Sequence, residues 1–282
     1  MKIKQAIDKA VIMLKINNID SSKIKARLLM QYILKQDRQY LIVYDNKELT
    51  KDQEEKYYKI INLHINGVPI EYITNTKEFM KMNFFINENV LIPRQDTEIL
   101  VEEVLEISKK INAVKILDLC TGSGAIGISI AKYLPNSKIT VVDISEEALK
   151  VAKRNAKINK VENQITFVKS NLFLNLKKEK YDIIVSNPPY IKKDIIKKLD
   201  KQVQNEPQIA LDGGYDGLDF YRKIISTSYE YMKTGSYLCL EIGYDQKKDV
   251  INLINNQDKY INTYSKKDLC DNDRIVVTKL II

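Results

Sequence analysis

The sequence predicts an α/β protein whose main domain is a parallel, doubly wound sheet. From about residue 98 onward, short apolar stretches typical of buried strands alternate with helical stretches. Polar or glycine-containing segments follow several of these strands, and the carboxyl ends of parallel strands form the sheet edge at which ligands bind. The chain has 282 residues, 44% of them hydrophobic, which suffices for about two domains with cores of their own.

The N-terminal part of the chain carries a different pattern. Apolar residues recur at helical spacing through residues 1–75 and predict a small all-helical domain. Thr50 and the polar residues 20–22 are expected to cap helices at their N-termini, and Gly67 is expected to end the last long helix. Residues 76–92 are expected to form a linker, a β-hairpin with an asparagine-rich turn.

Residues 93–282 carry the alternating pattern of the main domain. The expected helices are 98–110, 124–134 and 145–159, and the expected strands are 114–119, 138–143, 164–170, 181–186, 236–243 and 274–281. These strand runs are apolar enough to be buried on both faces, as strands covered by helices on both sides are.

The composition excludes several classes of protein. The three cysteines are widely spaced and there is one histidine, so neither a disulfide framework nor a metal site is expected. No apolar run is long enough to span a membrane, and charges interrupt the N-terminal stretch too often for a secretory signal. We therefore expect a cytoplasmic protein. The net charge of +8 suits an acidic partner, but no basic arm for nucleic acid is present.

A glycine-containing loop follows the expected strand 114–119. It reads Cys120-Thr121-Gly122-Ser123-Gly124 and leads into a helix, so that a ligand can approach the backbone closely. Asp143 ends the next strand about 20 residues later, where a carboxylate accepts hydrogen bonds from a ribose. This arrangement suits NAD or S-adenosylmethionine. Because the loop lacks the GxGxxG pattern and follows an acidic residue, Asp118, it favours the methyltransferase version.

A rigid loop, Asn187-Pro188-Pro189-Tyr190, follows the expected strand 181–186. Its prolines fix the backbone and remove two hydrogen-bond donors. The Asn187 side-chain oxygen and the Pro188 carbonyl can then accept both hydrogens of a planar NH2 group and aim its lone pair at an electrophilic methyl. The Tyr190 ring can stack on that group. An ordinary turn is the alternative interpretation, and the position of this loop at the same sheet edge as the glycine loop argues against it.

These segments resemble the release-factor glutamine N5-methyltransferase family (PrmC/HemK type), and the similarity runs along nearly the whole chain. The matching segments are VLIPRQDTEILVE (90–102), ILDLCTGSGAIGISIAK (116–132), VVDISEEALKVAKRNA (141–156), YDIIVSNPPYI (181–191) and NEPQIALDGGYDGLDFYRKII (205–225). NPPY is shared with other N-methyltransferases, whereas RQDTE and EPQIALDGGYDGLDFYR are much more specific to this family.

The resemblance implies a Rossmann-like, seven-stranded class I methyltransferase sheet behind a small N-terminal all-α domain that recognises the substrate. It implies S-adenosylmethionine as the methyl donor, S-adenosylhomocysteine as the product, and the glutamine of the GGQ motif in peptide-chain release factors as the substrate, with no nucleic-acid substrate. The implied residues are Cys120, Thr121, Gly122, Ser123, Gly124, Asp143, Asn171, Leu172 and Asn187 for the cofactor, Asn187, Pro188, Pro189 and Tyr190 for the substrate, and among these Asn187, Pro188 and Tyr190 for catalysis.

Three residues depart from the family pattern. Cys120 stands where glycine is frequent, and we expect an ordinary negative φ there, since a positive φ would strain a cysteine. Gln95 replaces a proline, and Asn171 stands where an acidic residue is common. Glu241, at the end of another expected strand, suits a structural role and a cofactor contact equally well.

Two other functions remain open from the sequence. One is methylation of adenine N6 in nucleic acid, because that amino group is also a planar NH2. Such an enzyme needs a surface for target recognition and base flipping, and residues 1–75 concentrate no basic charge. The other is a non-catalytic adaptor that binds release factors or ribosomes, against which the complete glycine loop and the NPPY segment argue.

Overall fold

The computed structural model describes residues 1–112 and 115–281. The chain forms two compact units. The smaller contains Met1–Asn75 together with Asp200–Asn205, and the larger contains Thr76–Leu199 and Glu206–Ile282. The short segment in the smaller unit is therefore contributed by a distant part of the sequence.

The smaller unit is all-helical. Its helices are α1 (Ile3–Ile16), α2 (Ser22–Leu34), α3 (Arg38–Val43), α4 (Lys51–Ile65), α5 (Ile70–Thr74) and α10 (Lys201–Gln204). Apolar residues at helical spacing fill its core, among them Leu14, Leu29, Tyr57 and Ile61. The Tyr57 hydroxyl donates to the carbonyl of Ala26, 2.9 Å away, which satisfies the one polar atom of that buried ring.

The expected helix ends in this unit are confirmed in part. Thr50 forms a capping box with Gln53, and Gly67 follows α4 with a φ of 99°. The expected side-chain cap within residues 20–22 is wrong. Ser21 enters α2 through a left-handed conformation and caps nothing, while the Ser22 hydroxyl donates to the carbonyl of Ile19.

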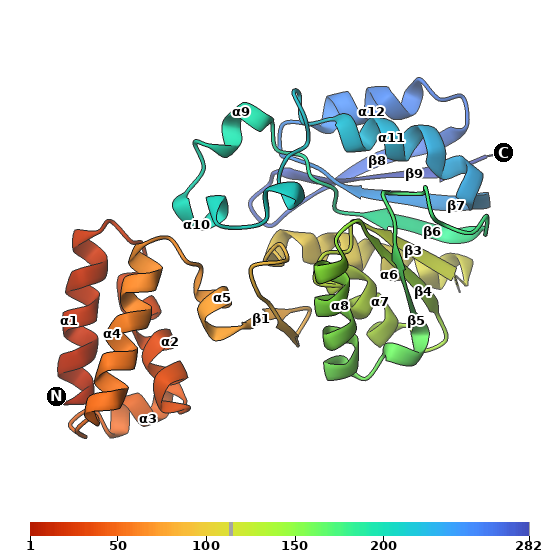
Figure 1. Cartoon of the computed structure of the whole chain (residues 1–282). Helices are drawn as coiled ribbons and strands as arrows, with labels where there is room; N and C mark the ends of the chain where they lie inside the picture. Colours follow the sequence, from red (N-terminus) through yellow and green to blue (C-terminus); the bar gives the residue numbers. More distant parts are fainter. Residues whose placement is uncertain (113–114, 282) are drawn as a thin grey trace. The chain divides into compact units, whose positions relative to one another are not determined.

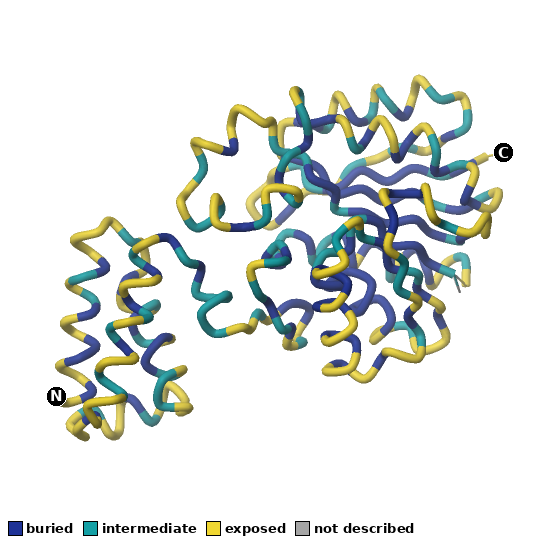
Figure 2. The backbone as a smooth tube through the Cα atoms, in the orientation of Figure 1, coloured by how far each residue is buried: buried dark blue, intermediate teal, exposed yellow. Residues whose placement is uncertain are grey.

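The larger unit is built on a seven-stranded sheet in the order β5-β4-β3-β6-β7-β9-β8. Its strands are β3 (Lys115–Leu119), β4 (Lys138–Asp143), β5 (Ile165–Lys169), β6 (Tyr181–Ser186), β7 (Met232–Glu241), β8 (Tyr260–Lys267) and β9 (Asp273–Leu280). Figure 2 shows much of this sheet as a dark, buried layer. A seven-stranded Rossmann-like sheet is thereby confirmed.

The expectation of an all-parallel sheet is wrong at one edge. β9 is antiparallel both to β7 and to β8. Only a short turn separates β8 from β9, and so short a connection can join antiparallel strands only. β8 itself was not expected, because most of its residues are polar and exposed, as is typical of an edge strand.

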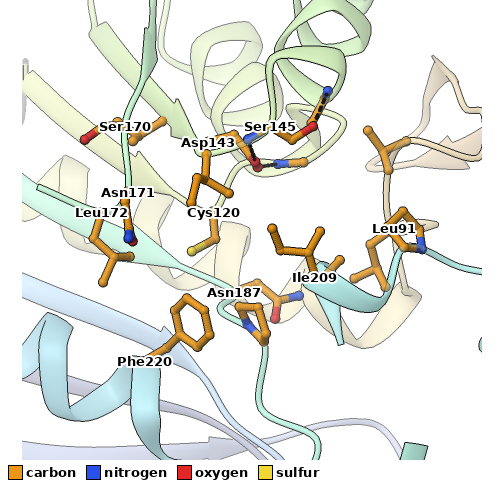
Figure 3. Close-up of a pocket in the computed structure, with 18 of the residues that line it drawn as sticks. Leu91, Cys120, Asp143, Ser145, Ser170, Asn171, Leu172, Asn187, Ile209 and Phe220 are labelled. Carbon is orange, nitrogen blue, oxygen red and sulfur yellow. Dashed lines mark hydrogen bonds between the residues drawn. The ribbon is translucent and has the colours of Figure 1, made fainter. Parts of the chain in front are cut away.

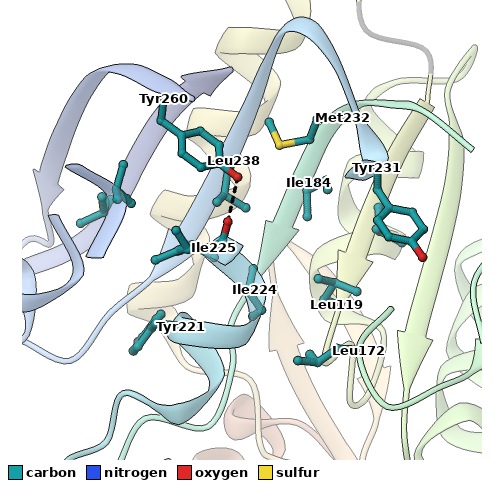
Figure 4. Packing of buried hydrophobic residues seen from close by; sticks show 14 of the residues in the cluster. Leu119, Leu172, Ile184, Tyr221, Ile224, Ile225, Tyr231, Met232, Leu238 and Tyr260 are labelled. Atoms are coloured by element: carbon teal, nitrogen blue, oxygen red, sulfur yellow. Dashed lines mark hydrogen bonds between the residues drawn. The ribbon is translucent and has the colours of Figure 1, made fainter. Parts of the chain in front are cut away.

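Two groups of helices cover the sheet. α11 (Asp219–Ser228) and α12 (Lys247–Asn255) lie together on one face, as Figure 1 shows. Tyr221 and Ile224 of α11 pack with Leu119 of β3 and Leu238 of β7 in the apolar cluster of Figure 4. The second group is α6 (Glu98–Ile111), α7 (Ala125–Tyr133) and α8 (Glu146–Asn159), which pack in sequence order.

A hairpin precedes the sheet, with strands β1 (Thr76–Phe79) and β2 (Met82–Phe85). Its turn consists of Met80 and Lys81, with φ values of 49° and 57°, and not of the asparagine-rich segment that was expected. Contacts with the sheet domain hold this turn, since the Met80 N–H donates to the Glu98 carboxylate 2.7 Å away. A hydrogen bond to a residue distant in sequence therefore stabilises a turn at Met80 and Lys81, although asparagine is the residue type that favours turns.

Several short helical segments complete the larger unit. They are α9 (Lys193–Ile196) and the 3-10 helices η1 (Gln95–Thr97), η2 (Glu162–Gln164), η3 (Gln208–Ala210) and η4 (Tyr229–Tyr231). Across the part of the chain that the structure describes, no helix has the length and apolar character needed to cross a lipid bilayer.

The contact between α7 and the sheet predicts the effect of one substitution. A Cβ atom on Gly127 would lie 2.7 Å from Val141 Cγ1 and 3.0 Å from an Asp118 carboxylate oxygen. We expect Gly127→Ala to lower the free energy of unfolding by about 1–3 kcal/mol, measured by urea denaturation. The loss should shrink in a Val141→Ala background, and an equal loss in both backgrounds would contradict this packing explanation.

Candidate active site

A cavity of about 940 Å³, including its open mouth, lies at the carboxyl ends of β3, β4, β5 and β6 (Figure 3). Its wall is formed by Asn89, Val90, Leu91, Cys120, Gly122, Val142, Asp143, Ile144, Ser145, Ala148, Ser170, Asn171, Leu172, Asn187, Pro189, Pro207, Ile209, Ala210, Phe220 and Lys223. All of these residues belong to the larger unit. The cavity occupies the edge at which open α/β sheets bind their ligands.

The structure brings most of the sequence-predicted site residues to this cavity. Those that line it are Cys120, Gly122, Asp143, Asn171, Leu172, Asn187 and Pro189. The others, Thr121, Ser123, Gly124, Pro188 and Tyr190, belong to the same loops but are not among the lining residues. Their contacts show what they do in the fold.

Thr121 braces the glycine loop from behind. Its hydroxyl donates to the Asp118 carboxylate at 2.6 Å, and its N–H donates to the carbonyl of Val142 at 2.9 Å. The same Asp118 oxygen accepts the Gly127 N–H at 3.0 Å, so one carboxylate ties the loop to the first turn of α7. Asp118 is fully buried and its other oxygen has no partner among the described residues. Burial raises the pKa of this carboxyl to about 7.

Ser123 and Gly124 hold the loop against α8. The Ser123 carbonyl accepts the Asn155 side-chain N–H at 2.9 Å. Gly124 has a φ of 81°, and a Cβ there would lie 3.1 Å from Ala152 Cβ of α8. Glycine is therefore favoured at this position mainly by the backbone conformation, with little space left beside α8.

Asp143 joins the ends of two strands at the cavity wall. One of its oxygens accepts the Gly122 N–H at 2.8 Å and the other accepts the Ser145 N–H at 2.9 Å, the bonds drawn in Figure 3. Burial raises the pKa of this carboxyl, while these backbone N–H groups lower it. An ionised carboxylate has about four acceptor sites, so acceptor capacity remains for a hydroxyl group of a ligand.

Cys120 is the one residue of the loop whose expected conformation is wrong. Its φ is 60°, in the left-handed region, whereas a negative φ was expected. The chain leaves β3 in a sharp turn that the bonds of Thr121 and Gly122 impose, so the position retains the geometry for which glycine is better suited. Burial raises the pKa of the Cys120 thiol, which stays neutral. Leu172, also on the cavity wall, has a φ of 49°.

Asn187 lines the cavity and, among the described residues, has an acceptor without a donor. Its side-chain NH2 donates to the Thr97 hydroxyl oxygen at 3.4 Å. Within the described residues its Oδ1 atom accepts no hydrogen bond. The preceding Ser186 hydroxyl donates to the carbonyl of Leu119 at 2.8 Å and fixes the end of β6 beside that of β3.

Tyr190 is anchored away from the cavity. Its hydroxyl donates to the Glu241 carboxylate at 3.3 Å, and its carbonyl accepts the Gln246 side-chain N–H at 3.0 Å. A Cβ on Gly213 would lie 2.7 Å from Tyr190 Cα, and one on Gly217, whose φ is 80°, would lie 2.5 Å from the Tyr190 carbonyl oxygen. Two glycines of the segment LDGGYDG thus let it pack directly on the backbone of the NPPY loop.

The RQDTE segment connects the parts of the site. Arg94 pairs with the buried Glu206, which also accepts the Ile92 N–H at 2.9 Å. Asp96 lies 3.4 Å from Arg274 of β9, and Glu98 accepts the N–H of the hairpin turn described above. Gln95 is exposed at the start of η1, so its substitution for proline leaves these contacts in place.

Glu241 lies behind the NPPY loop and is not among the lining residues of the cavity. It is 1% exposed, and one of its oxygens has no hydrogen-bond partner among the described residues. Burial raises its pKa to about 7, although the Thr97 hydroxyl and the charge of Arg274 lower it. These contacts support the structural alternative for Glu241.

Part of the cavity wall consists of residues that the sequence did not single out. The missed residues outside the strand ends are Asn89, Val90, Leu91, Pro207, Ile209, Ala210, Phe220 and Lys223. All but Asn89 lie in segments already quoted as typical of the family, namely VLIPRQDTE and EPQIALDGGYDGLDFYRK. The resemblance to the family therefore included these segments, but no chemical pattern in them indicated which individual residues would line the cavity.

Known protein families and solved structures share the two-part organisation and the sheet fold of this chain. Residues 94–209 match the model of the Methyltransferase small domain family, and residues 5–74 match that of the PrmC N-terminal domain. A solved methyltransferase from Pyrococcus furiosus aligns with a TM-score of 0.51 and 16% identity, over 71% of this chain and 89% of its own. The hMettl16 catalytic domain, solved in complex with the MAT2A 3'UTR hairpin 6, aligns with a TM-score of 0.56 and 14% identity, over 70% of this chain and 74% of its own.

The fold and the cavity define a methyltransferase of the Rossmann-like class. Relatives named release factor glutamine methyltransferase are 42% identical in Clostridium acetobutylicum and 41% identical in Clostridium botulinum, each over 98% of both chains. The relative of that name in Moorella thermoacetica is 35% identical over 97% of both chains. The chain belongs to the release factor glutamine methyltransferase family.

The raised pKa of Glu241 predicts a pH dependence of stability. Between about pH 4.5 and pH 7 the folded protein holds a proton on the Glu241 carboxyl. The unfolded chain, in which this carboxyl has an ordinary pKa near 4.5, has already lost that proton. The free energy of unfolding should therefore fall as pH rises from about 4.5 to 7, by up to about 3 kcal/mol for this group. Urea denaturation at several pH values should show this fall in the wild type relative to Glu241→Gln. Identical slopes for both proteins would contradict the burial explanation.

Proposed function

We propose that this chain transfers the methyl group of S-adenosylmethionine to the side-chain amide nitrogen of the glutamine in the GGQ motif of peptide-chain release factors. The observation that supports the proposal is that Asn187, whose Oδ1 atom has no donor among the described residues, lines the same cavity as Asp143. The release factor glutamine methyltransferases to which the chain is similar supply the substrate.

The residues of the cavity suit the proposed cofactor. Asp143 has acceptor capacity left for the ribose, and an added Cβ on Gly122 would meet nothing within 4 Å, so a ligand has room to approach the backbone there. Asn171 and Leu172 are proposed to contact the adenine, and Cys120 to lie along the cofactor as a neutral thiol. Thr121, Ser123 and Gly124 support the loop and shape the site without lining it.

The NPPY loop suits an amide substrate. Asn187 Oδ1 and the Pro188 carbonyl are proposed to accept the two hydrogens of the glutamine NH2, and Pro189 to form part of the wall. S-adenosylmethionine, when bound, would supply an electrophilic methyl carbon. The amide nitrogen held by Asn187 and Pro188 would form the new bond to that carbon and lose one proton to solvent, while the sulfur would keep the electron pair of the broken bond. Orientation of a weak nucleophile in a confined site provides the main rate enhancement.

Tyr190 is also proposed to take part in catalysis, and its contacts support a role in holding the NPPY loop. Its hydroxyl is held by Glu241 and its carbonyl by Gln246, so it fixes the course of the loop that carries Asn187 and Pro188. Stacking of its ring on the substrate amide stays a prediction.

The proposed division of labour assigns residues 1–75 to substrate recognition, residues 76–92 to a hairpin linker and residues 93–282 to methyl transfer. A release factor as partner places the reaction in the cytoplasm. The substrate is a protein, so no nucleic acid is bound as the methyl acceptor.

The decisive experiment is methyl transfer to a purified release factor from S-adenosylmethionine labelled in its methyl group. We expect label on the wild-type factor and none on a factor whose GGQ glutamine is replaced by alanine. Asn187→Ala should reduce kcat by about 100-fold or more while calorimetry shows cofactor binding intact. The proposal fails if the wild-type enzyme labels DNA or RNA but no release factor.

The ribose assignment predicts a different phenotype for Asp143. Asp143→Ala should weaken S-adenosylmethionine binding by about 10- to 100-fold, because charge-assisted hydrogen bonds to the ligand and the brace on Gly122 are both lost. Isothermal titration calorimetry measures the change. Equal affinity in the variant and the wild type would refute the assignment.

A further inference from the structure

We propose that Thr97 is a positioning residue that sets the orientation of the Asn187 amide, so that the oxygen and not the NH2 group faces the cavity. This inference rests on the proposed function and deepens it. It gives the threonine of the RQDTE segment a task in catalysis and relates that segment to the NPPY loop, although the two lie 90 residues apart in the sequence.

The orientation of this amide matters because its two ends are nearly equal in size but opposite in chemistry. The carboxamide of Asn187 carries an acceptor on one side and two donors on the other. With the oxygen toward the cavity, the side chain accepts a hydrogen from a substrate NH2 group. With the amide reversed, an NH2 group would face the substrate NH2, and no hydrogen bond could form between them.

Thr97 is placed to decide between these two orientations. It is 3% exposed at the end of η1, and its hydroxyl oxygen accepts from the Asn187 side-chain nitrogen at 3.4 Å. A threonine hydroxyl has only one hydrogen. If that hydrogen is engaged elsewhere, the oxygen can only accept from Asn187, and the reversed amide would set two acceptors against each other.

The Glu241 carboxylate is the proposed acceptor of that hydrogen. Its carboxyl is buried and accepts from the Tyr190 hydroxyl at 3.3 Å, while its Oε2 atom has no hydrogen-bond partner among the described residues and so has room to accept. The Thr97 hydroxyl lies near enough to lower the pKa of this carboxyl, as a donor does. In the proposed order the ionised Glu241 accepts from the Thr97 hydroxyl and the Thr97 oxygen accepts from the Asn187 NH2 group, which leaves Asn187 Oδ1 for the substrate.

The position of Thr97 is itself fixed by the neighbours of η1. Asp96 lies 3.4 Å from Arg274, and Glu98 accepts the Met80 N–H at 2.7 Å. Because residues on both sides of Thr97 are held by distant segments, its hydroxyl is presented at a defined place, as an orienting group requires.

The test compares Thr97→Val, which keeps the shape of the side chain and removes the hydroxyl, with Thr97→Ser, which keeps the hydroxyl. Thr278→Val is the matched control, since Thr278 is also buried and hydrogen-bonded but lies in β9. Methyl transfer to a release factor is measured as kcat and KM, and S-adenosylmethionine binding is measured by calorimetry.

We expect Thr97→Val to lower kcat by about 10- to 100-fold, with KM and cofactor affinity changed less than about threefold. Thr97→Ser should recover most of the loss, and Thr278→Val should leave kcat near the wild-type value. Thr97→Ala replaces Thr97→Val if the valine variant does not fold.

A second measurement uses the symmetry of a carboxylate. Asn187→Asp provides an acceptor toward the substrate whichever way the group turns, so an orienting hydroxyl becomes unnecessary. We expect Thr97→Val to change kcat by less than about twofold in the Asn187→Asp background, against about 10-fold or more in the wild-type background.

Three results would overturn the inference. These are a wild-type kcat in Thr97→Val, a loss in Thr97→Ser as large as in Thr97→Val, or a parallel loss of cofactor binding. Each is distinct from failure of the proposed function, in which the wild-type enzyme itself would transfer no methyl group to the release factor.

Discussion

The site depends on the register of three neighbouring parallel strands. Leu119 at the end of β3 pairs with Val142 of β4 on one side and with Ser186 of β6 on the other. The next residues along each strand are Cys120, Asp143 and Asn187. The backbone hydrogen bonds between these strands therefore bring the glycine loop, Asp143 and the NPPY loop to the same edge of the sheet, independently of side-chain contacts. A slip of one residue in either pairing would separate these groups.

Around this edge, segments remote in sequence act as supports. RQDTE contacts β9, the hairpin turn, Glu206 and Asn187, while the glycines of LDGGYDG press against the backbone at Tyr190. Most of these residues do not line the cavity. They fix the course of the loops that do.

Two buried carboxyl groups flank the site, and both have a pKa raised to about 7 by burial. Asp118 organises the glycine loop from one side of the sheet, and Glu241 lies behind the NPPY loop. Neither has all its oxygens satisfied among the described residues. Such groups lower stability near neutral pH, while their hydrogen bonds hold the glycine loop and Tyr190 of the NPPY loop in place.

The sequence by itself determined the alternation of strands and helices, the edge of the sheet at which the site lies, and the loops that carry Gly122, Asp143 and Asn187. These follow from apolar periodicity and from residue types with a single physical use, and such signals are local. Tertiary structure decided the positive φ of Cys120, the turn at Met80, the polar edge strand β8 and the contact of Thr97 with Asn187. Cys120, Met80 and Thr97 each depend on contacts with residues far along the chain, and β8 becomes a strand by pairing with β9 at the edge of the sheet. The local sequence around a residue does not specify where such a partner lies in space.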